Sequence, residues 1–218
     1  MGKVSGKSIL SIALLACLSA NSSAIVITDQ LYNTGLDESG NAVASSGGVD
    51  GNWLVDGNSA VTYKHRAYAA NNSASQWVSV NQNGGNETRY ATTYTYSTTF
   101  DLAGYDASSA IISGLWGADN YGSIFLNGVD TGNLLSFGYS AFNRLSQFSI
   151  SDYFISGVNT LSVELTNGHL NPARDPGPGA LRFDKLELQA TAVSEPGNIA
   201  LFSLGFLGLF FSRKKLNS

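Results

Sequence analysis

Apolar and polar positions alternate along several stretches in the middle of the chain. The alternation is clearest at 90–102, where even-numbered positions hold tyrosine, threonine, phenylalanine and leucine and odd-numbered positions are small or polar. A period of two with aromatic and β-branched residues is typical of a β-strand with one buried face. Further strands are expected at 110–116, 123–126, 147–150, 161–165 and 180–190. No long stretch has the apolar stripe of an amphipathic helix, so the pattern predicts an all-β chain.

One hairpin can be placed from its turn residues. Asn127 and Gly128 follow the stretch 123–126, and both tolerate the positive φ of a type I′ turn. The sequence therefore predicts a return strand that begins at Val129.

The last expected strand changes parity in its middle. Leu181 and Phe183 point one way by parity, and Leu186 and Leu188 point the other way. All four can reach one core if the strand carries an extra residue near 184–185, so we expect a β-bulge there. Burial of both faces of this strand is the alternative.

Composition agrees with short strands joined by turns. The chain is rich in Gly, Ser, Thr, Asn and Tyr, and it is poor in Lys, Glu and Met, which favours strands over helices. About 170 residues lie between the two terminal segments, enough for one β-sandwich and too few for two ordinary domains. The expected fold is an antiparallel β-sandwich of seven or more strands.

The N-terminal segment has the order of a secretory signal peptide. Lys3 and Lys7 precede an apolar stretch at 9–16, and small residues follow up to Ala24. We expect residues 1–24 to form a signal helix and to be removed by cleavage after Ala24.

Cys17, the one cysteine of the chain, leaves a second interpretation open. It ends the sequence Leu14-Leu15-Ala16-Cys17, which is similar to a lipobox, whose cysteine is lipidated after cleavage before it. Under the signal-peptide interpretation the mature chain has no cysteine, so its packed core must stabilise it without disulfides.

The C-terminal segment says most about where the protein goes. Glu195-Pro196 precedes an apolar run of 13 residues at 199–211. A basic cluster follows, which consists of Arg213, Lys214 and Lys215. Roughly 20 apolar residues span a bilayer comfortably, so this run is short for a permanent transmembrane helix, and its basic end would stay cytoplasmic. The expected parts are a sandwich domain at 25–190, a linker at 191–198, and an apolar helix with its basic tail at 199–215.

A signal peptide combined with a Glu-Pro dipeptide, a short apolar helix and a basic end resembles the PEP-CTERM sorting signal of Gram-negative bacteria. The resemblance covers 195–215, and the sequence departs from the family pattern at Ser194, where the family usually has proline. It implies that a membrane-embedded exosortase processes the protein, that the inner membrane holds it transiently, and that it reaches the cell surface or extracellular matrix. An ordinary tail anchor or a stop-transfer helix is the alternative.

Charge is divided unevenly between these parts. Five of the 12 basic residues lie in the terminal segments, whereas all 16 acidic residues lie between Asp29 and Glu195. The exported part therefore has 7 basic and 16 acidic residues, a formal charge of −9, against −4 for the whole chain. Such an acidic domain would repel nucleic-acid phosphates and anionic lipids, so we expect neither as a partner.

A second resemblance lies within the expected sandwich. The stretches 116–120, 124–128 and 154–161 form a progression of Asp-Asn, Asn-Gly and Gly-x-Asn-x-Leu. This progression resembles the galactose-binding-like jelly roll over about 90–190. The resemblance implies a jelly-roll sandwich of the kind found in sugar-binding domains attached to bacterial glycosidases.

Two repeated tripeptides offer oxygen ligands for calcium. Asp-Gly-Asn occurs at 50–52 and again at 56–58. Galactose-binding-like domains often hold a structural calcium, so the resemblance keeps this ion open without naming its ligands. Two Asp-Gly turns are the alternative.

The same resemblance gives the first binding candidates. Its functional interpretation places Trp116, Asp119 and Asn120 around a sugar, with the indole on the sugar ring and the polar pair on its hydroxyls. The structural alternative puts Trp116 in the core and lets the polar pair bond to nearby backbone N–H groups. Asn159 is expected to fix the turn before its strand, with Gly157 supplying an unusual φ.

Two loops add further candidates. His169, Arg174 and Asp175 lie in the proline-rich stretch 167–179, and an ordered loop at a sandwich rim is where binding usually resides. An exposed Arg–Asp pair without a ligand is the alternative. Tyrosines and polar residues at 63–68 and 81–90 either line a polysaccharide-binding surface or cover a strand.

Motifs for catalysis are missing from the sequence. Its two histidines, His65 and His169, lie outside any metal-ligand spacing, and there is no Gly-x-Ser-x-Gly elbow, phosphate loop or mature cysteine nucleophile. We therefore expect a non-enzyme that binds exopolysaccharide. A structural or adhesive surface protein without sugar binding is the alternative, and a polysaccharide-degrading enzyme with two carboxyl groups is a weaker one.

Overall fold

The structure is a computed structural model that describes residues 23–85, 91–168 and 177–193. These residues belong to one compact unit, Ser23–Val193. Its described strands are β1 (Ala24–Ile27), β2 (Val49–Val55), β3 (Asn58–Thr62), β4 (Val78–Ser79), β5 (Thr92–Asp101), β6 (Tyr105–Asp119), β7 (Tyr121–Leu126), β8 (Val129–Leu135), β9 (Ser146–Ile150), β10 (Val158–Asn167) and β11 (Ala180–Ala192). A short 3₁₀ helix, η1 (Tyr139–Ala141), lies between β8 and β9.

Residues 1–22 of the expected signal helix and the whole expected C-terminal helix lie outside the described residues. Ala24 begins β1, and β11 continues to Ala192, into the expected linker. Within the three described ranges, no helix has the length and apolar character that crossing a membrane requires.

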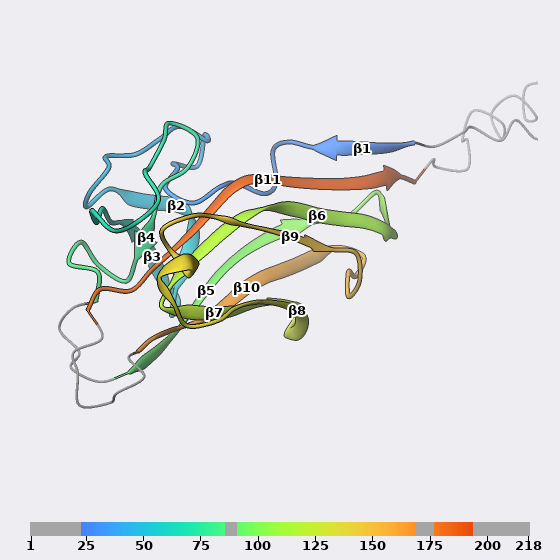
Figure 1. The fold of residues 1–218 in the computed structure, drawn as a ribbon. Helices are drawn as coiled ribbons and strands as arrows, with labels where there is room; N and C mark the ends of the chain where they lie inside the picture. Colours follow the sequence, from blue (N-terminus) through green and yellow to red (C-terminus); the bar gives the residue numbers. More distant parts are fainter. Residues whose placement is uncertain (1–22, 86–90, 169–176, 194–218) are drawn as a thin grey trace, which may run out of the picture. The chain divides into compact units, whose positions relative to one another are not determined.

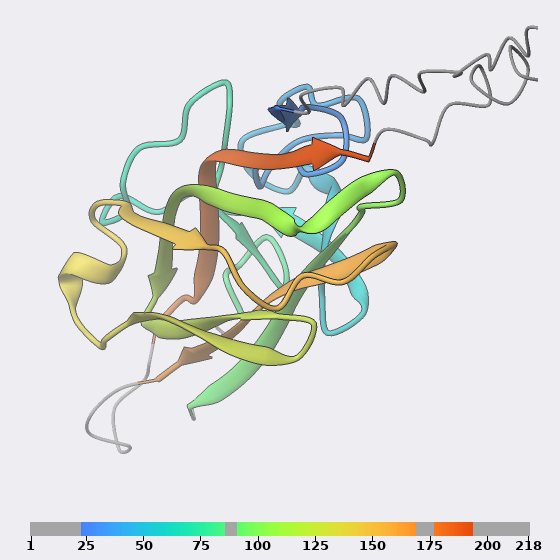
Figure 2. The ribbon, with the colours of Figure 1, turned by 90° about the vertical axis from the view of Figure 1, so that its right-hand side faces the viewer.

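The strand pairs of the described residues are all antiparallel. They form one path in the order β8-β7-β10-β5-β2-β3-β4-β11-β6-β9, and β1 pairs with β11 beside this path. Figures 1 and 2 show the path folding over, so that β5, β10 and β7 form one layer and β11, β6 and β9 face it. The all-β antiparallel class expected from the sequence is confirmed, and the structure adds that β3 and β4 connect the two layers.

The alternating pattern of β5 is confirmed. The side chains of Tyr94, Tyr96, Thr98 and Phe100 are buried, and those between them are exposed or half-buried. The partner strand β10 alternates in the same way. Because each strand buries every second side chain, one face of this layer supplies the core.

The expected hairpin between β7 and β8 is also present. Asn127 and Gly128 have φ values of 52° and 79°, which is the backbone that a type I′ turn requires. The return strand β8 begins at Val129, as predicted.

Asn159 holds the turn before β10, as expected. Its Oδ1 accepts the N–H of Ile155 at 2.9 Å, and its Nδ2 donates to the carbonyls of Ile155 at 2.8 Å and Gly157 at 2.7 Å. Gly157 has φ 82°. Nδ2 of Asn127 also donates to Oδ1 of Asn159 at 2.8 Å, so the hairpin and this turn support each other.

The parity change in β11 is a β-bulge, as predicted. The register pair that follows Asp184 is Glu187, so three steps along β11 face two steps along β6. Lys185 occupies the bulge with φ 53°. Beyond it, Leu188 is buried and Leu186 packs against the same core. One extra residue therefore returns the second half of the strand to the core side.

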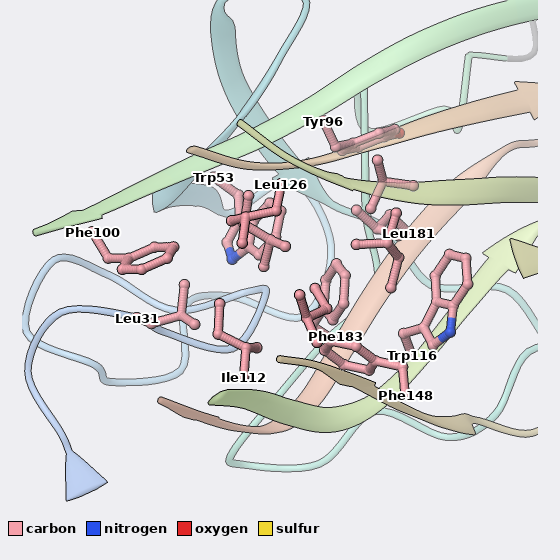
Figure 3. Packing of buried hydrophobic residues seen from close by; sticks show 14 of the residues in the cluster. Leu31, Trp53, Tyr96, Phe100, Ile112, Trp116, Leu126, Phe148, Leu181 and Phe183 are labelled. Atoms are coloured by element: carbon pink, nitrogen blue, oxygen red, sulfur yellow. The ribbon is translucent and has the colours of Figure 1, made fainter. Parts of the chain in front are cut away.

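The core lies between the two layers, with Phe183 of β11 near its centre (Figure 3). The Phe183 ring stacks on Trp53 at 4.9 Å and on Trp116 at 6.2 Å, and Phe148 meets its edge at 5.4 Å, measured between ring centroids. These aromatic contacts join β2, β6 and β9 to β11. Trp116 is 1% exposed, so its indole is a core group.

Candidate functional site

Segment 63–77 leaves the sheet after β3 and returns to it at β4. The N–H of Tyr63 donates to the carbonyl of Trp77 at 2.8 Å and so closes the two ends of the segment. The Trp77 indole N–H donates to the Ala69 carbonyl at 2.8 Å, and its backbone N–H donates to Oδ1 of Asn71 at 2.9 Å. Because Trp77 is 1% exposed, the segment wraps around a buried ring that defines its shape.

A buried arginine of β11 anchors the far side of this segment. Nε and Nη2 of Arg182 donate to Oγ of Ser75 at 2.9 and 2.8 Å, and Nη1 donates to the Ala70 carbonyl. Nη2 also lies 3.5 Å from Oδ2 of Asp184. Burial lowers the pKa of Arg182, and the Asp184 carboxylate opposes that shift. The guanidinium is thus a structural group that holds the backbone at 70–75 in place.

Segment 63–77 also packs against the chain around η1. The N–H of Ala69 donates to the Phe142 carbonyl at 2.8 Å. Four rings then follow one another, with centroid separations of 5.1 Å (Tyr139 to Phe142), 5.6 Å (Phe142 to Tyr68) and 5.2 Å (Tyr68 to His65). We call these four rings the aromatic row. Tyr139 at its outer end is 61% exposed, so the row reaches the surface.

A pocket of about 390 Å³ lies along segment 63–77. Its walls include the rings of His65, Tyr68 and Trp77 and the side chains of Lys64 and Arg66. The other described lining residues are small or carry hydroxyl or amide groups, and none of the described lining residues is acidic. We call it the 63–77 pocket. It combines aromatic surface, hydrogen-bonding groups and positive charge, the groups that fix a small polar ligand.

Behind the pocket wall, Tyr68 is bonded to a buried carboxyl group. Its hydroxyl donates to Oδ2 of Asp119 at 2.8 Å, and Nδ2 of Asn120 donates to Oδ1 of Asp119 at 2.7 Å. Burial raises the pKa of Asp119 to about 7, and the hydrogen bond from Tyr68 opposes this shift. Burial and the nearby Asp119 also raise the pKa of Tyr68.

The side chains of Asn120 and Tyr68 also bond to described residues on either side of segment 169–176, its two stems. Oδ1 of Asn120 accepts the N–H of Gly168 at 2.8 Å, and the Tyr68 hydroxyl lies 3.1 Å from the Pro178 carbonyl. Nδ2 of Asn167 donates to the Gly177 carbonyl at 2.8 Å and joins the two stems directly. The predicted candidates of the loop itself, His169, Arg174 and Asp175, lie outside the described residues.

The three candidates from the second resemblance do not form one open site. The functional interpretation of Trp116 is contradicted, because its ring stacks on Phe183 inside the core and offers no face to a sugar. Asp119 and Asn120 do lie together, but they bond to Tyr68 and Gly168 rather than to neighbouring backbone N–H groups. Their role in this structure is to position the pocket wall and the loop stems.

The sequence identified part of the pocket and missed the rest. The stretch 63–68 was a candidate surface, and it supplies Lys64, His65, Arg66 and Tyr68. Nothing in the sequence pointed to Ser45, Gln76 or Trp77 as further lining residues, or to the packing of Phe142 on Tyr68, because a local pattern does not show which segments will meet.

A second, wider hollow of about 690 Å³ lies over β6 and β9. Its polar lining includes Asn133, Gln147, Ser149 and Lys185. Phe148 in its wall is buried, as Tyr68 and Trp77 are in the 63–77 pocket, but the described lining of this hollow holds no counterpart of the half-buried His65 ring. The 63–77 pocket is the better binding candidate.

Asp50-Gly51-Asn52 lies within β2, whereas Asp56 and Gly57 form the turn between β2 and β3, with φ values of 47° and 80°. Oδ1 of Asp50 accepts the N–H groups of Asn52 at 2.8 Å and Trp53 at 2.9 Å, and Oδ2 accepts that of Gly35 at 2.6 Å. Oδ1 of Asp56 accepts from a neighbouring strand, from the N–H of Thr95 at 2.8 Å. Within the described ranges, no group of three or more His, Cys, Asp and Glu side chains is placed to hold a metal ion.

No protein-family model and no characterised protein sequence matches the chain. Among solved structures, CBM35 from Paenibacillus barcinonensis matches with a TM-score of 0.31 and 13% identity, over 74% of this chain and 98% of that one. A family 35 carbohydrate binding module from an environmental isolate matches with a TM-score of 0.32 and 11% identity, over 74% of this chain and 98% of that one.

Beta-glucosidase from Kluyveromyces marxianus matches with a TM-score of 0.28 and 14% identity over 49% of this chain, which spans 12% of the length of that enzyme. The structures matched over nearly their whole length are thus carbohydrate-binding modules. At these TM-scores the fold rests on the strand pairing described above.

Proposed function

We propose that this chain is an exported surface protein whose sandwich, of the galactose-binding-like jelly-roll type, binds exopolysaccharide at the 63–77 pocket and along the aromatic row. One observation carries the proposal: Tyr139 is 61% exposed and connects through Phe142 to Tyr68 in the pocket wall. Exposed rings beside a polar pocket are what a sugar requires, because its C–H face packs on a ring while its hydroxyls need hydrogen bonds.

Several groups can serve the sugar hydroxyls. Ser45 lines the pocket and is exposed, and Lys64 and Arg66 are exposed as well. Nδ2 of Asn71 is buried and has no hydrogen-bond partner within the described part of the chain. A buried donor without a partner is costly, so an acceptor that reached it after a small adjustment would be bound favourably.

Export is proposed on the sequence features at both ends. The signal peptide directs the chain out of the cytoplasm, and the Glu-Pro dipeptide, apolar run and basic tail hold it at the inner membrane for an exosortase. The acidic character of the exported part keeps it soluble at the cell surface or in the extracellular matrix.

Loss of the exposed ring should weaken polysaccharide binding. We expect Tyr139→Ala to lower the affinity of the full-length protein for its glycan about tenfold, or about 1.4 kcal/mol, since a stacked ring contributes about that much. The matched control is Tyr153→Ala, which removes a ring that is 49% exposed elsewhere. A glycan array with both variants measures this. Equal losses would contradict the assignment of the row, and no binding to any glycan by the wild type would overturn the proposed function.

The second candidate is a structural or adhesive surface protein without sugar binding. The burial of Trp116 favours it, because the ring that resembled a sugar platform serves the core instead. Degradation of polysaccharide has less support: glycoside hydrolysis uses two carboxyl groups, and among the residues that the structure describes no carboxylate lines either hollow.

A further inference from the structure

We infer that the 63–77 pocket selects saccharide residues that carry a negative charge, as a carboxylate or a sulfate ester. The inference rests on the proposed function and names the class of sugar that the same site prefers.

Positive charge is concentrated at this pocket. The described residues include 13 Asp and Glu but five Lys and Arg, and two of these five cations, Lys64 and Arg66, line this one pocket. His65 lies between them in the same wall. In a chain with a surplus of acidic residues, cations spread at random would have acidic neighbours, and the part of the lining that the structure describes contains none.

The two cations are available to a ligand. Both side chains are exposed. The ion pair found among the described residues joins Arg182 to Asp184, so Lys64 and Arg66 are not paired with a described carboxylate. An exposed cation beside a concave wall keeps its charge for an anion, and arginine can bind a carboxylate or a sulfate through two parallel hydrogen bonds.

The nearest buried acid does not cancel this charge. Asp119 lies behind Tyr68 and is 5% exposed, so Tyr68 separates it from the pocket. Burial raises the pKa of Asp119 to about 7, so near neutral pH the carboxyl is partly uncharged. Asp184 is bonded to Arg182 and to Nδ2 of Asn72, so its charge is also engaged.

The His65 ring, which lies beside Lys64 and Arg66 in the pocket wall, favours a charged sugar over a simple anion. A pyranose that carries a carboxylate or a sulfate can pack its C–H face on the aromatic row while its charged group reaches Lys64 or Arg66. The acidic surface elsewhere would repel a dense polyphosphate, so one charged group at a time fits this site better than nucleic acid does.

The test compares matched glycans that differ in charge alone. The full-length protein is titrated with polygalacturonate and its methyl ester, and with a sulfated galactan and its desulfated form. We expect the charged member of at least one pair to bind tenfold or more tightly, with less difference at high salt. Which pair shows the preference distinguishes carboxylate from sulfate.

Two double variants with the same change in net charge complete the test. We expect Lys64→Gln with Arg66→Gln to reduce binding of the charged glycan to that of the neutral one. Arg144→Gln with Lys185→Gln removes two exposed cations from other places and should leave binding unchanged. Equal affinity within both glycan pairs, or equal losses in both double variants, would overturn the inference while the proposed function stands. If no glycan binds, the proposed function itself fails.

Discussion

The Tyr68 hydroxyl has one proton and two acceptors within reach. Oδ2 of Asp119 lies at 2.8 Å and the Pro178 carbonyl at 3.1 Å. When Asp119 is ionised, the proton is drawn to the carboxylate and the carbonyl loses its donor. When Asp119 is protonated, it can donate to Tyr68, which then donates to Pro178. Burial favours the neutral carboxyl and raises its pKa, whereas the hydrogen bond from Tyr68 favours the ionised form and opposes this shift.

This network gives the protein a predictable pH dependence. The pKa of Asp119 is about 7 in the folded chain and about 3.9 in an unfolded one, so the folded state binds more protons between these values. The free energy of unfolding should therefore fall by up to about 4 kcal/mol as pH rises from 4 to 7, and stay level above 7. Asp119→Asn, which cannot ionise, should lack this component.

Urea unfolding of wild type and variant across this pH range measures the difference between the two curves. Asp152→Asn, at an exposed carboxyl, is the control and should run parallel to the wild type. Parallel curves for Asp119→Asn as well would show that Asp119 titrates normally.

Strand β11 shows how one residue decides which face of an element is buried. Ahead of the bulge Phe183 is buried, and after it Leu188 is buried on the opposite parity. Lys185 is the extra residue of the bulge. Its backbone is left-handed, with φ 53°, a conformation that lysine adopts less readily than glycine. The strand can then pair with β6 on both sides of the bulge and keep one continuous core.

Deletion of Lys185 should therefore reverse the second half of β11. Leu188 would turn towards solvent, and the polar neighbours of Leu188 would turn inwards. This change should lower the free energy of unfolding by about 2–5 kcal/mol or abolish folding. Lys185→Gly keeps the residue count and suits the left-handed backbone, so we expect it to be as stable as the wild type or up to about 1 kcal/mol more stable. Chemical denaturation compares the two, and a deletion as stable as the substitution would contradict the bulge as the cause of the parity change.

At the scale of the whole chain, the terminal segments and the sandwich carry different information. In each terminal segment, charged and apolar residues follow one another in a set order, and export machinery recognises signals of this kind. The sandwich holds the 63–77 pocket, whose described lining joins this segment to Ser45. The proposed export route can therefore be tested without altering the proposed binding site.

Processing at the C-terminal segment should depend on Pro196. In a Gram-negative host that has an exosortase, we expect the surface form to begin at Ile25 and to lack 199–215. Pro196→Ala should stay in the inner-membrane fraction with that segment intact, whereas Ser194→Pro, which restores the family pattern, should be processed at least as well as the wild type. Fractionation with mass spectrometry of both ends measures this. Equal processing of Pro196→Ala and wild type would contradict the sorting interpretation.

Features made by neighbours in the chain could be predicted from the sequence. Alternation in β5, the hairpin at Asn127-Gly128 and the bulge at Lys185 depend on backbone conformation and on side-chain parity, both of which are local. The candidate site could be predicted only in part. The sequence marks the polar pair Asp119 and Asn120 as candidates, but it does not show their partners Tyr68 and Gly168, which lie far away in the sequence.

The amino-acid sequence by itself determined the all-β class, most strand positions and the turns, because each follows from the order of residues within a short stretch. The roles of the terminal segments stay predictions. The tertiary structure alone decided that Trp116 is a core residue and that Tyr68 lies between a buried carboxyl and a pocket. It also decided that Tyr139 and Phe142 pack in one row with Tyr68 and that this row reaches the surface. These facts depend on long-range packing, in which burial and charge are set by segments that meet only after the chain has folded.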